Sequence, residues 1–176
     1  IDVFAIAPSN TQIIYVAINN DFYRSTNGGA SWTALQISGT SSITGITVSN
    51  VNANQVWISR SGYGNGSKVF ESTNGGTTWT NISGSLPSLP ANCIVFENGS
   101  LSGVYVGTDV GVYYRDATMS DWTPFFYFLP NLMVFDIEIN YTEGTLIACT
   151  HTRGIWKTPL ISSFIGAPIA DFTANP

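Results

Sequence analysis

The 176-residue sequence predicts an all-β fold made of one four-stranded unit that is repeated along the chain. The nonapeptide STNGGASWT recurs almost unchanged after 47 residues, and a diverged third copy follows after another 43, which places their tryptophans at Trp32, Trp79 and Trp122. Short apolar segments separated by turn residues lie between the copies, and no segment has a helical period. A period in the forties built from short strands is typical of the blades of a β-propeller.

Each repeat contains the same strands in the same order, named A to D. The fourth repeat lacks the nonapeptide and strand D, so we expect about four antiparallel blades, the last incomplete, within a larger propeller. The remaining blades are expected from upstream sequence or another chain, because an unpaired strand C leaves an exposed sheet edge. Strand A is predicted at residues 3–7, 43–48, 93–96 and 135–139, strand B at 15–17, 56–58, 104–106 and 146–148, strand C at 22–24, 69–71, 112–114 and 155–157, and strand D after the tryptophan, as in 32–37.

Composition excludes several classes of function. Six Lys and Arg against eleven Asp and Glu give a formal net charge of −5 without a basic run, which argues against a nucleic-acid partner. The longest apolar run is far shorter than the ~20 residues that cross a bilayer, so no membrane span is expected. No spacing matches a metal or cofactor motif, and we expect neither. Cys93 and Cys149 are interpreted as two small buried hydrophobes or as one disulfide.

The nonapeptide itself has the chemistry of a tight turn between strands C and D. A short polar side chain can bond the N–H groups of the turn, glycines supply positive φ, and the tryptophan packs on the blade. The pattern resembles the Asp-box of BNR-repeat proteins, although two copies carry Asn where that family most often has Asp. The resemblance implies a structural role at the outer rim, without catalysis or metal binding, for Ser25, Asn27, Gly29 and Trp32, for Ser72, Asn74, Gly76 and Trp79, and for Asp116 and Trp122.

Two further resemblances concern the C-terminal part. The segments GTDVGVY at 107–113 and RGIW at 153–156 resemble the last blades of xyloglucanase-like propellers in secreted bacterial proteins of the Bacteroidetes type. The last ten residues, from Ala167, resemble the opening strand of a polycystic-kidney-disease (PKD) domain of immunoglobulin-like fold. The implied organisation is a propeller segment at 1–160, a linker at 161–168 and the start of a PKD domain at 169–176. It implies a secreted or cell-surface protein, which agrees with the low content of charged residues, 10%.

Asp136 and Glu138 are the candidates for a catalytic role. They stand one residue apart in strand A of the fourth repeat, where earlier repeats have apolar residues, and alternate residues of a strand share a face. Glycosidic cleavage uses a carboxylate pair. The xyloglucanase-like enzymes, however, place their acids across a cleft between two propellers. We therefore interpret the pair as solvated or hydrogen-bonded groups near the central channel and predict no catalytic residue in this segment.

Four residues in predicted B–C turns are candidates for ligand binding. Asp109 lies in the turn of the third repeat, His151 and Arg153 in that of the fourth, and Tyr63 in a glycine-rich turn of the second. These turns open onto one face of a propeller, where an aromatic ring and neutral polar groups suit a sugar. The alternative is that His151 is an ordinary turn residue and that Tyr63 caps the packing of its hairpin.

Three functions remain open at this stage. The first is a non-catalytic binding or scaffold propeller of an exported multidomain protein, which engages a glycan or a protein partner. The second is the C-terminal part of a xyloglucanase-like glycoside hydrolase, and the third is a sortilin-type peptide-binding propeller. A sialidase is disfavoured because its substrate carboxylate needs three arginines, whereas Arg24 and Arg115 adjoin or form the box turns.

Overall fold

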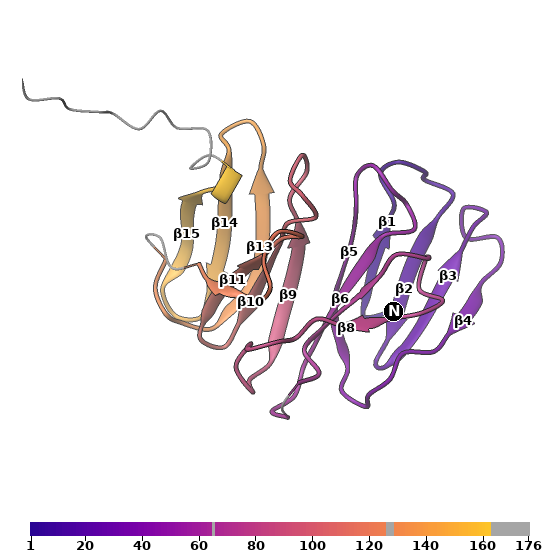
Figure 1. Ribbon diagram of the computed structural model, residues 1–176, viewed down its shortest axis with the longest axis horizontal. Helices are drawn as coiled ribbons and strands as arrows, with labels where there is room; N and C mark the ends of the chain where they lie inside the picture. Colours follow the sequence, from indigo (N-terminus) through magenta and orange to yellow (C-terminus); the bar gives the residue numbers. More distant parts are fainter. Residues whose placement is uncertain (65, 126–128, 163–176) are drawn as a thin grey trace, which may run out of the picture.

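The computed structural model describes residues 1–64, 66–125 and 129–162, and it consists of four antiparallel sheets, which we call blades 1 to 4 (Figure 1). The blades follow one another across the molecule, from blade 1 in indigo to blade 4 in orange and yellow. Blades 1 to 3 have four strands, whereas blade 4 has three, in the order β13-β14-β15. The all-β prediction and the repeated four-stranded unit are confirmed, and within the described residues the last blade has the three strands predicted for it.

Strands A to D of each blade pair in chain order, as short antiparallel neighbours do. Blade 1 comprises β1 (Val3–Ile6), β2 (Ile14–Ile18), β3 (Asp21–Ser25) and β4 (Thr33–Leu35). Blade 2 comprises β5 (Ile43–Val48), β6 (Val56–Arg60), β7 (Val69–Ser72) and β8 (Thr80–Asn81). Blade 3 comprises β9 (Ala91–Phe96), β10 (Val104–Thr108), β11 (Gly111–Arg115) and β12 (Thr123–Pro124). Blade 4 comprises β13 (Val134–Asn140), β14 (Thr145–Thr150) and β15 (Gly154–Pro159).

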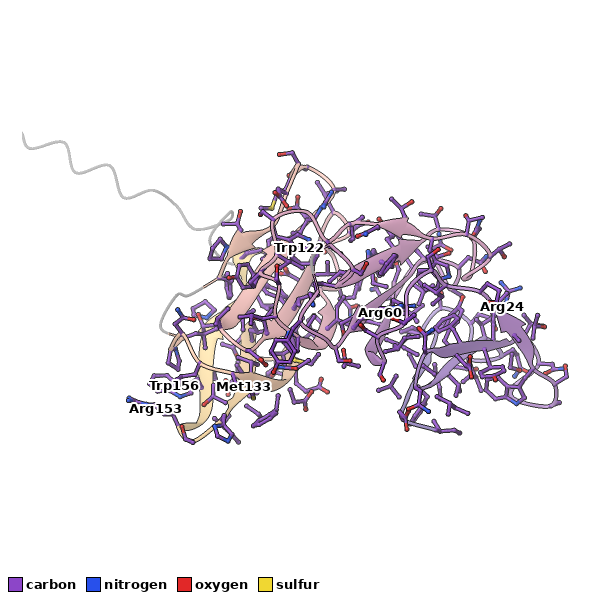
Figure 2. All side chains as sticks on the ribbon, turned by 90° about the horizontal axis from the view of Figure 1, so that it is seen from below. Arg24, Arg60, Trp122, Met133, Arg153 and Trp156 are labelled. Carbon is purple, nitrogen blue, oxygen red and sulfur yellow. The ribbon has the colours of Figure 1, made fainter. Side chains whose placement is uncertain are left out.

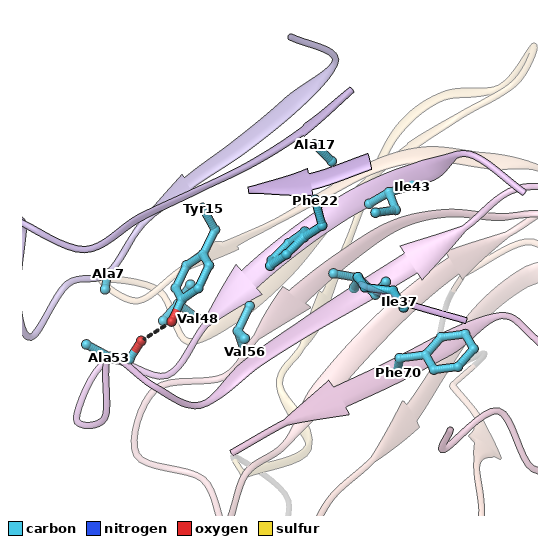
Figure 3. Close-up of a cluster of buried hydrophobic side chains, with 11 residues drawn as sticks. Ala7, Tyr15, Ala17, Phe22, Ile37, Ile43, Val48, Ala53, Val56 and Phe70 are labelled. Carbon is cyan, nitrogen blue, oxygen red and sulfur yellow. Dashed lines mark hydrogen bonds between the residues drawn. The ribbon is translucent and has the colours of Figure 1, made fainter. Parts of the chain in front are cut away.

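The blades pack face to face, and the alternation of side chains along each strand decides which residues meet. We call the face toward the next blade the forward face and the other the rear face. Tyr15 and Phe22, on the forward face of blade 1, pack against Val56 and Phe70 on the rear face of blade 2 (Figure 3). The Tyr15 hydroxyl also donates to the carbonyl of Ala53 at 2.8 Å, the dashed line in Figure 3.

The next two interfaces repeat this arrangement. Trp57 on blade 2 meets Val106 on blade 3, and Tyr105 on the opposite face of blade 3 meets Leu146 on blade 4. The innermost strands also pack in series, β1 against β5, β5 against β9 and β9 against β13. They form the wall of a channel-like groove of about 630 Å³.

Both copies of the nonapeptide form the same turn. The Ser25 hydroxyl accepts the N–H of Gly29 at 2.8 Å, and Asn27 Oδ1 accepts the N–H of Ser31 at 2.9 Å. Asn27 Nδ2 donates to the Ser31 hydroxyl at 2.8 Å, a bond that a carboxylate cannot donate. The second copy forms the same three hydrogen bonds at the same distances. The Ser72 hydroxyl accepts the N–H of Gly76, Asn74 Oδ1 accepts the N–H of Thr78, and Asn74 Nδ2 donates to the Thr78 hydroxyl.

The third copy has a different bonding pattern. Asp116 Oδ1 accepts the N–H and the hydroxyl of Thr118, at 2.8 and 2.7 Å. Asp121 Oδ1 accepts the N–H groups of Ser85 and Trp122, at 3.0 and 2.8 Å, and these two bonds lower the pKa of Asp121. The turn is therefore tied to blade 2 through an aspartate that the first two copies lack.

The three tryptophans differ in what covers them. Trp122 is 5% exposed and donates its Nε1–H to the carbonyl of Ile82 on the preceding blade at 2.6 Å. Trp79 packs edge-on against Phe22 of its preceding blade, with ring centroids 5.2 Å apart. Trp32 is 44% exposed, because the rear face of blade 1 has no blade against it. The Trp32 ring lies beside Val16 and Tyr23 of its own blade, so its packing on a blade is partial within the described residues.

The predicted linker begins in contact with the propeller. Leu160 is buried in the core between blades 3 and 4, and the N–H of Ile161 donates to the Tyr105 hydroxyl at 2.8 Å. The rest of the linker and the PKD-like tail, residues 163–176, lie outside the described residues.

Candidate functional site

The candidate site lies where the B–C turns of blades 3 and 4 meet the first residues of strand A; we call this surface the turn face. A one-residue bulge shapes it, since the register of strand A shifts there in blades 2, 3 and 4 and leaves Thr44, Asn92 and Phe135 as the extra residues. Thr44 donates to the carbonyl of Ala91 at 2.5 Å, and Asn92 Nδ2 donates to that of Val134 at 3.1 Å. In both cases the bulged side chain reaches the next blade.

In blade 4 the bulged residue is aromatic and faces outward. Phe135 is 51% exposed, and its ring meets the ring of His151 edge-on, with centroids 5.5 Å apart. The N–H of His151 donates to the carbonyl of Met133 at 2.8 Å, which fixes the turn beside the start of β13. Sequence reasoning missed Phe135. The signal was its place between Val134 and Asp136, where a break in the alternation of apolar residues marks the bulge.

Asp109 lies in the same region and is held there by a hydrogen bond from Asn92. The Asn92 amide donates to Asp109 Oδ1 at 3.0 Å as well as to Val134, so it ties the B–C turn of blade 3 to the first residue of β13. Asp109 also faces Lys68, whose pKa is lowered by burial and raised in part by this carboxylate. The structure therefore places Asp109 and His151 on one surface. Asn92 links Asp109 to the carbonyl of Val134, and the next residue, Phe135, contacts His151.

Arg153 and Tyr63 are exposed at other points of this face. Figure 2 shows Arg153 at the edge of blade 4 near Met133 and Trp156, and its carbonyl accepts the Trp156 Nε1–H at 3.0 Å. Tyr63 is 74% exposed in the β6–β7 turn. Among the described residues no hydrogen bond or ring contact joins Tyr63 to Asp109 or His151.

Asp136 and Glu138 lie in the channel groove on the forward face of blade 4. They pair across the sheet with Cys149 and Ile147, which confirms that the two carboxylates share a face. Asp136 Oδ1 accepts the N–H of Ile137 at 3.0 Å. Within the described residues no third titratable group hydrogen-bonds to the pair.

The two cysteines are free thiols. Cys93 is buried, and burial, followed by the Asp136 carboxylate, raises the pKa of its thiol. Its side chain points to the interface between blades 3 and 4, whereas Cys149 lies on the other face of blade 4. The interpretation as a small buried hydrophobe holds for Cys93, Cys149 is only half-buried, and the alternative of a disulfide is wrong for this structure.

Several solved structures share this fold. The chain superposes on an ancestral GH74 enzyme with a TM-score of 0.68 and 22% identity over 84% of this chain and 21% of that one. It superposes on the GH74 xyloglucanase of Xanthomonas campestris with a TM-score of 0.70 and 15% identity over 89% and 29%. The YCF48 protein of Cyanidioschyzon merolae gives 0.62 and 13% over 89% and 54%. The chain is a segment of a β-propeller.

The chain spans about a quarter of the length of the GH74 structures and about half of the YCF48 protein. A YCF48 protein bound to a D1 peptide also matches, with a TM-score of 0.57 and 15% identity over 84% of this chain and 51% of that one. No protein-family model and no curated protein sequence matches the chain.

Metal-ligating clusters and membrane-spanning helices are both absent from the described part of the chain. No group of three or more His, Cys, Asp or Glu side chains there gathers in a way that holds a metal ion. No helix in the described part of the chain is long and apolar enough to cross a membrane.

Proposed function

We propose that this chain is a non-catalytic binding and scaffold segment of a larger β-propeller, exported to the cell surface or secreted, which engages a glycan or a protein partner. The observation that carries the binding role is the exposed pair of Phe135 and His151 beside the hydrogen-bonded pair of Asn92 and Asp109. A flat ring next to amide and carboxylate groups is the arrangement that a sugar or a peptide side chain uses, since one side is apolar and the other is polar.

The scaffold role rests on the rear face of blade 1. Phe4, Ile6, Ile18 and Trp32 are exposed there, at positions whose counterparts in the other blades pack on a preceding blade. Its occupant is another blade of the same four-stranded type, since three interfaces within the chain are built in this way. Without that blade the face is a contiguous apolar surface, which monomeric soluble proteins rarely leave open.

The two neighbour families support the two kinds of ligand. A GH74 xyloglucanase acts on a glycan, and a YCF48 protein has been seen with a peptide. The glycan is the first ligand to test, because the turn face offers an aromatic ring beside amide and carboxylate groups.

The test measures binding of the purified chain to xyloglucan, xylan and mannan by affinity electrophoresis. We expect Phe135→Ala to weaken binding by about tenfold, which corresponds to about 1.4 kcal/mol. Leu101→Ala is the matched control, because Leu101 is an exposed apolar residue in the A–B turn, at the opposite end of blade 3. Equal affinity of the Phe135→Ala variant and the wild type would contradict the proposed surface.

The glycoside hydrolase remains the second candidate, since Asp136 and Glu138 face the channel groove. Release of reducing sugar from xyloglucan that depends on either carboxylate would establish it and would refute the non-catalytic proposal. A sortilin-type peptide receptor is the weaker alternative; failure of all three polysaccharides, together with saturable binding of a synthetic peptide at the turn face, would support it.

A further inference from the structure

A cavity of about 280 Å³ lies between blades 2 and 3, at the end of the blades opposite the turn face. Its polar wall consists of Gln55 and Glu71 from blade 2 and of Ser102, Arg115 and Asp116 from blade 3. Met119, from the diverged third copy of the box turn, closes one side. The third copy of the box turn supplies part of this wall, although its motif predicts a structural turn and no ligand site.

Comparison with the preceding interface explains why the cavity exists. Arg24 occupies the position in blade 1 that Glu71 occupies in blade 2, one residue before the serine of the box turn. The Arg24 guanidinium crosses to blade 2 and donates to the carbonyl of Gly75 at 2.9 Å, which fills the space. Glu71 is shorter and is held on its own blade by Gln55 Nε2 at 3.0 Å. The corresponding space between blades 2 and 3 is therefore empty of side chains.

The groups in the cavity have hydrogen-bonding capacity left over. Gln55 Nε2 is shared between Glu71 Oε1 and the Ser102 hydroxyl, at 3.0 and 3.1 Å. Arg115 donates through Nη1 to the carbonyl of Ile82 at 3.1 Å. Within the described residues no hydrogen bond to Glu71 Oε2 is seen, and the Arg115 charge also acts on the Asp121 carboxylate, whose pKa it helps to lower. An acidic and a basic side chain thus line one small space.

The charge and size of the cavity limit what it can bind. A simple anion would meet the carboxylates of Glu71 and Asp116, and an apolar molecule would bury polar groups without partners. Two neighbouring hydroxyls fit both halves of the wall, since one donates to Glu71 and the other accepts from Arg115. Ligand pockets usually measure ~300–1,000 Å³, so this one is at the lower limit and holds one small residue.

We propose that the cavity between blades 2 and 3 binds a single neutral sugar residue, either free or at the end of a glycan. Vicinal hydroxyls of the ring bond to Glu71 and Arg115, and its C–H side lies on Met119 and Val104. This site is separate from the turn face and does not depend on the function proposed for it.

The test is an NMR titration of the ¹⁵N-labelled chain with methyl glycosides of glucose, galactose, mannose, xylose and fucose, followed through the side-chain amide of Gln55. We expect saturable shifts for at least one glycoside, with a Kd of about 1 mM as for a weak single-residue ligand. Glu71→Gln should weaken binding at least tenfold, and Glu71→Arg, which introduces the side chain found at Arg24, should abolish it.

Two variants serve as controls. Glu143→Gln removes an exposed carboxylate that pairs with Lys157 in blade 4 and should leave the titration unchanged. Phe135→Ala alters only the turn face, so it should leave the titration followed through Gln55 unchanged. Its polysaccharide binding then reports on the turn face alone, which separates failure of that site from failure of the cavity site. Absence of shifts for all five glycosides, equal binding by Glu71→Arg and wild type, or shifts with Nα-acetyl-lysine methylamide in place of the glycosides would each overturn the proposal.

Discussion

Trp122→Ala is expected to destabilise the chain by about 2 to 3 kcal/mol more than Trp32→Ala, although the two residues end copies of the same turn. Trp122 is 5% exposed and Trp32 is 44% exposed. For a ring that buries up to ~250 Å², this difference is about 100 Å² of apolar area, worth about 2.5 kcal/mol before the denatured state is considered. Trp122 also loses its bond to Ile82, worth about 1 kcal/mol.

The assay is urea unfolding followed by far-ultraviolet circular dichroism, because fluorescence changes when a tryptophan is removed. Unchanged m-values are needed before the midpoints are compared. Trp79→Ala should fall between the other two variants, since its ring packs on Phe22 at 5.2 Å. An equal loss for Trp32→Ala and Trp122→Ala would refute the reasoning that a preceding blade supplies the stabilisation. In a longer chain with a further blade, Trp32→Ala should cost as much as Trp122→Ala.

Three more substitutions probe separate features. Asn74→Ala should cost about 1 kcal/mol in thermal unfolding, whereas Asn74→Asp should cost under about 0.5 kcal/mol because the acceptor oxygen remains; equal losses would mean that the amide donor is essential. The lowered pKa of Asp121 contributes stability above about pH 4, and this stability is lost as the pH falls toward that pKa. The difference in urea midpoint between the wild type and Asp121→Asn should therefore shrink below about pH 4. A difference that stays constant down to about pH 3 would contradict this. Asp136→Asn and Glu138→Gln should leave polysaccharide binding within about threefold, whereas a ~10³-fold loss of a hydrolytic rate would make either residue catalytic.

The fold was predictable because its signals are local. The repeated nonapeptide, the alternation of apolar residues and the turn residues act within a few positions of one another, so the strands of the described blades were visible in the sequence. The hydrogen bonds of the turn were predictable for the same reason. Asn27 and Asn74 bond to groups four residues away, and two copies with the same letters form the same geometry.

The candidate site was only half predictable. Its B–C turns carry Asp109 and His151, which turn chemistry and topology place at one end of the blades. Phe135 was not expected there, since a bulge depends on the partner strand as well as on its own sequence. The bond from Asn92 to Val134 joins residues 42 positions apart, and no local pattern encodes such a contact.

By itself the sequence determined the number of repeats, their strand order, the turn chemistry and the pairing of Asp136 with Glu138 on one face. Tertiary structure alone decided which of the three similar tryptophans is covered, where the bulged residues point, and that a cavity remains beside Glu71 but not beside Arg24. The physical reason is that these properties belong to the space between two blades. Each blade supplies one wall of that space, and whether it is filled depends on side chains about 45 residues apart acting together.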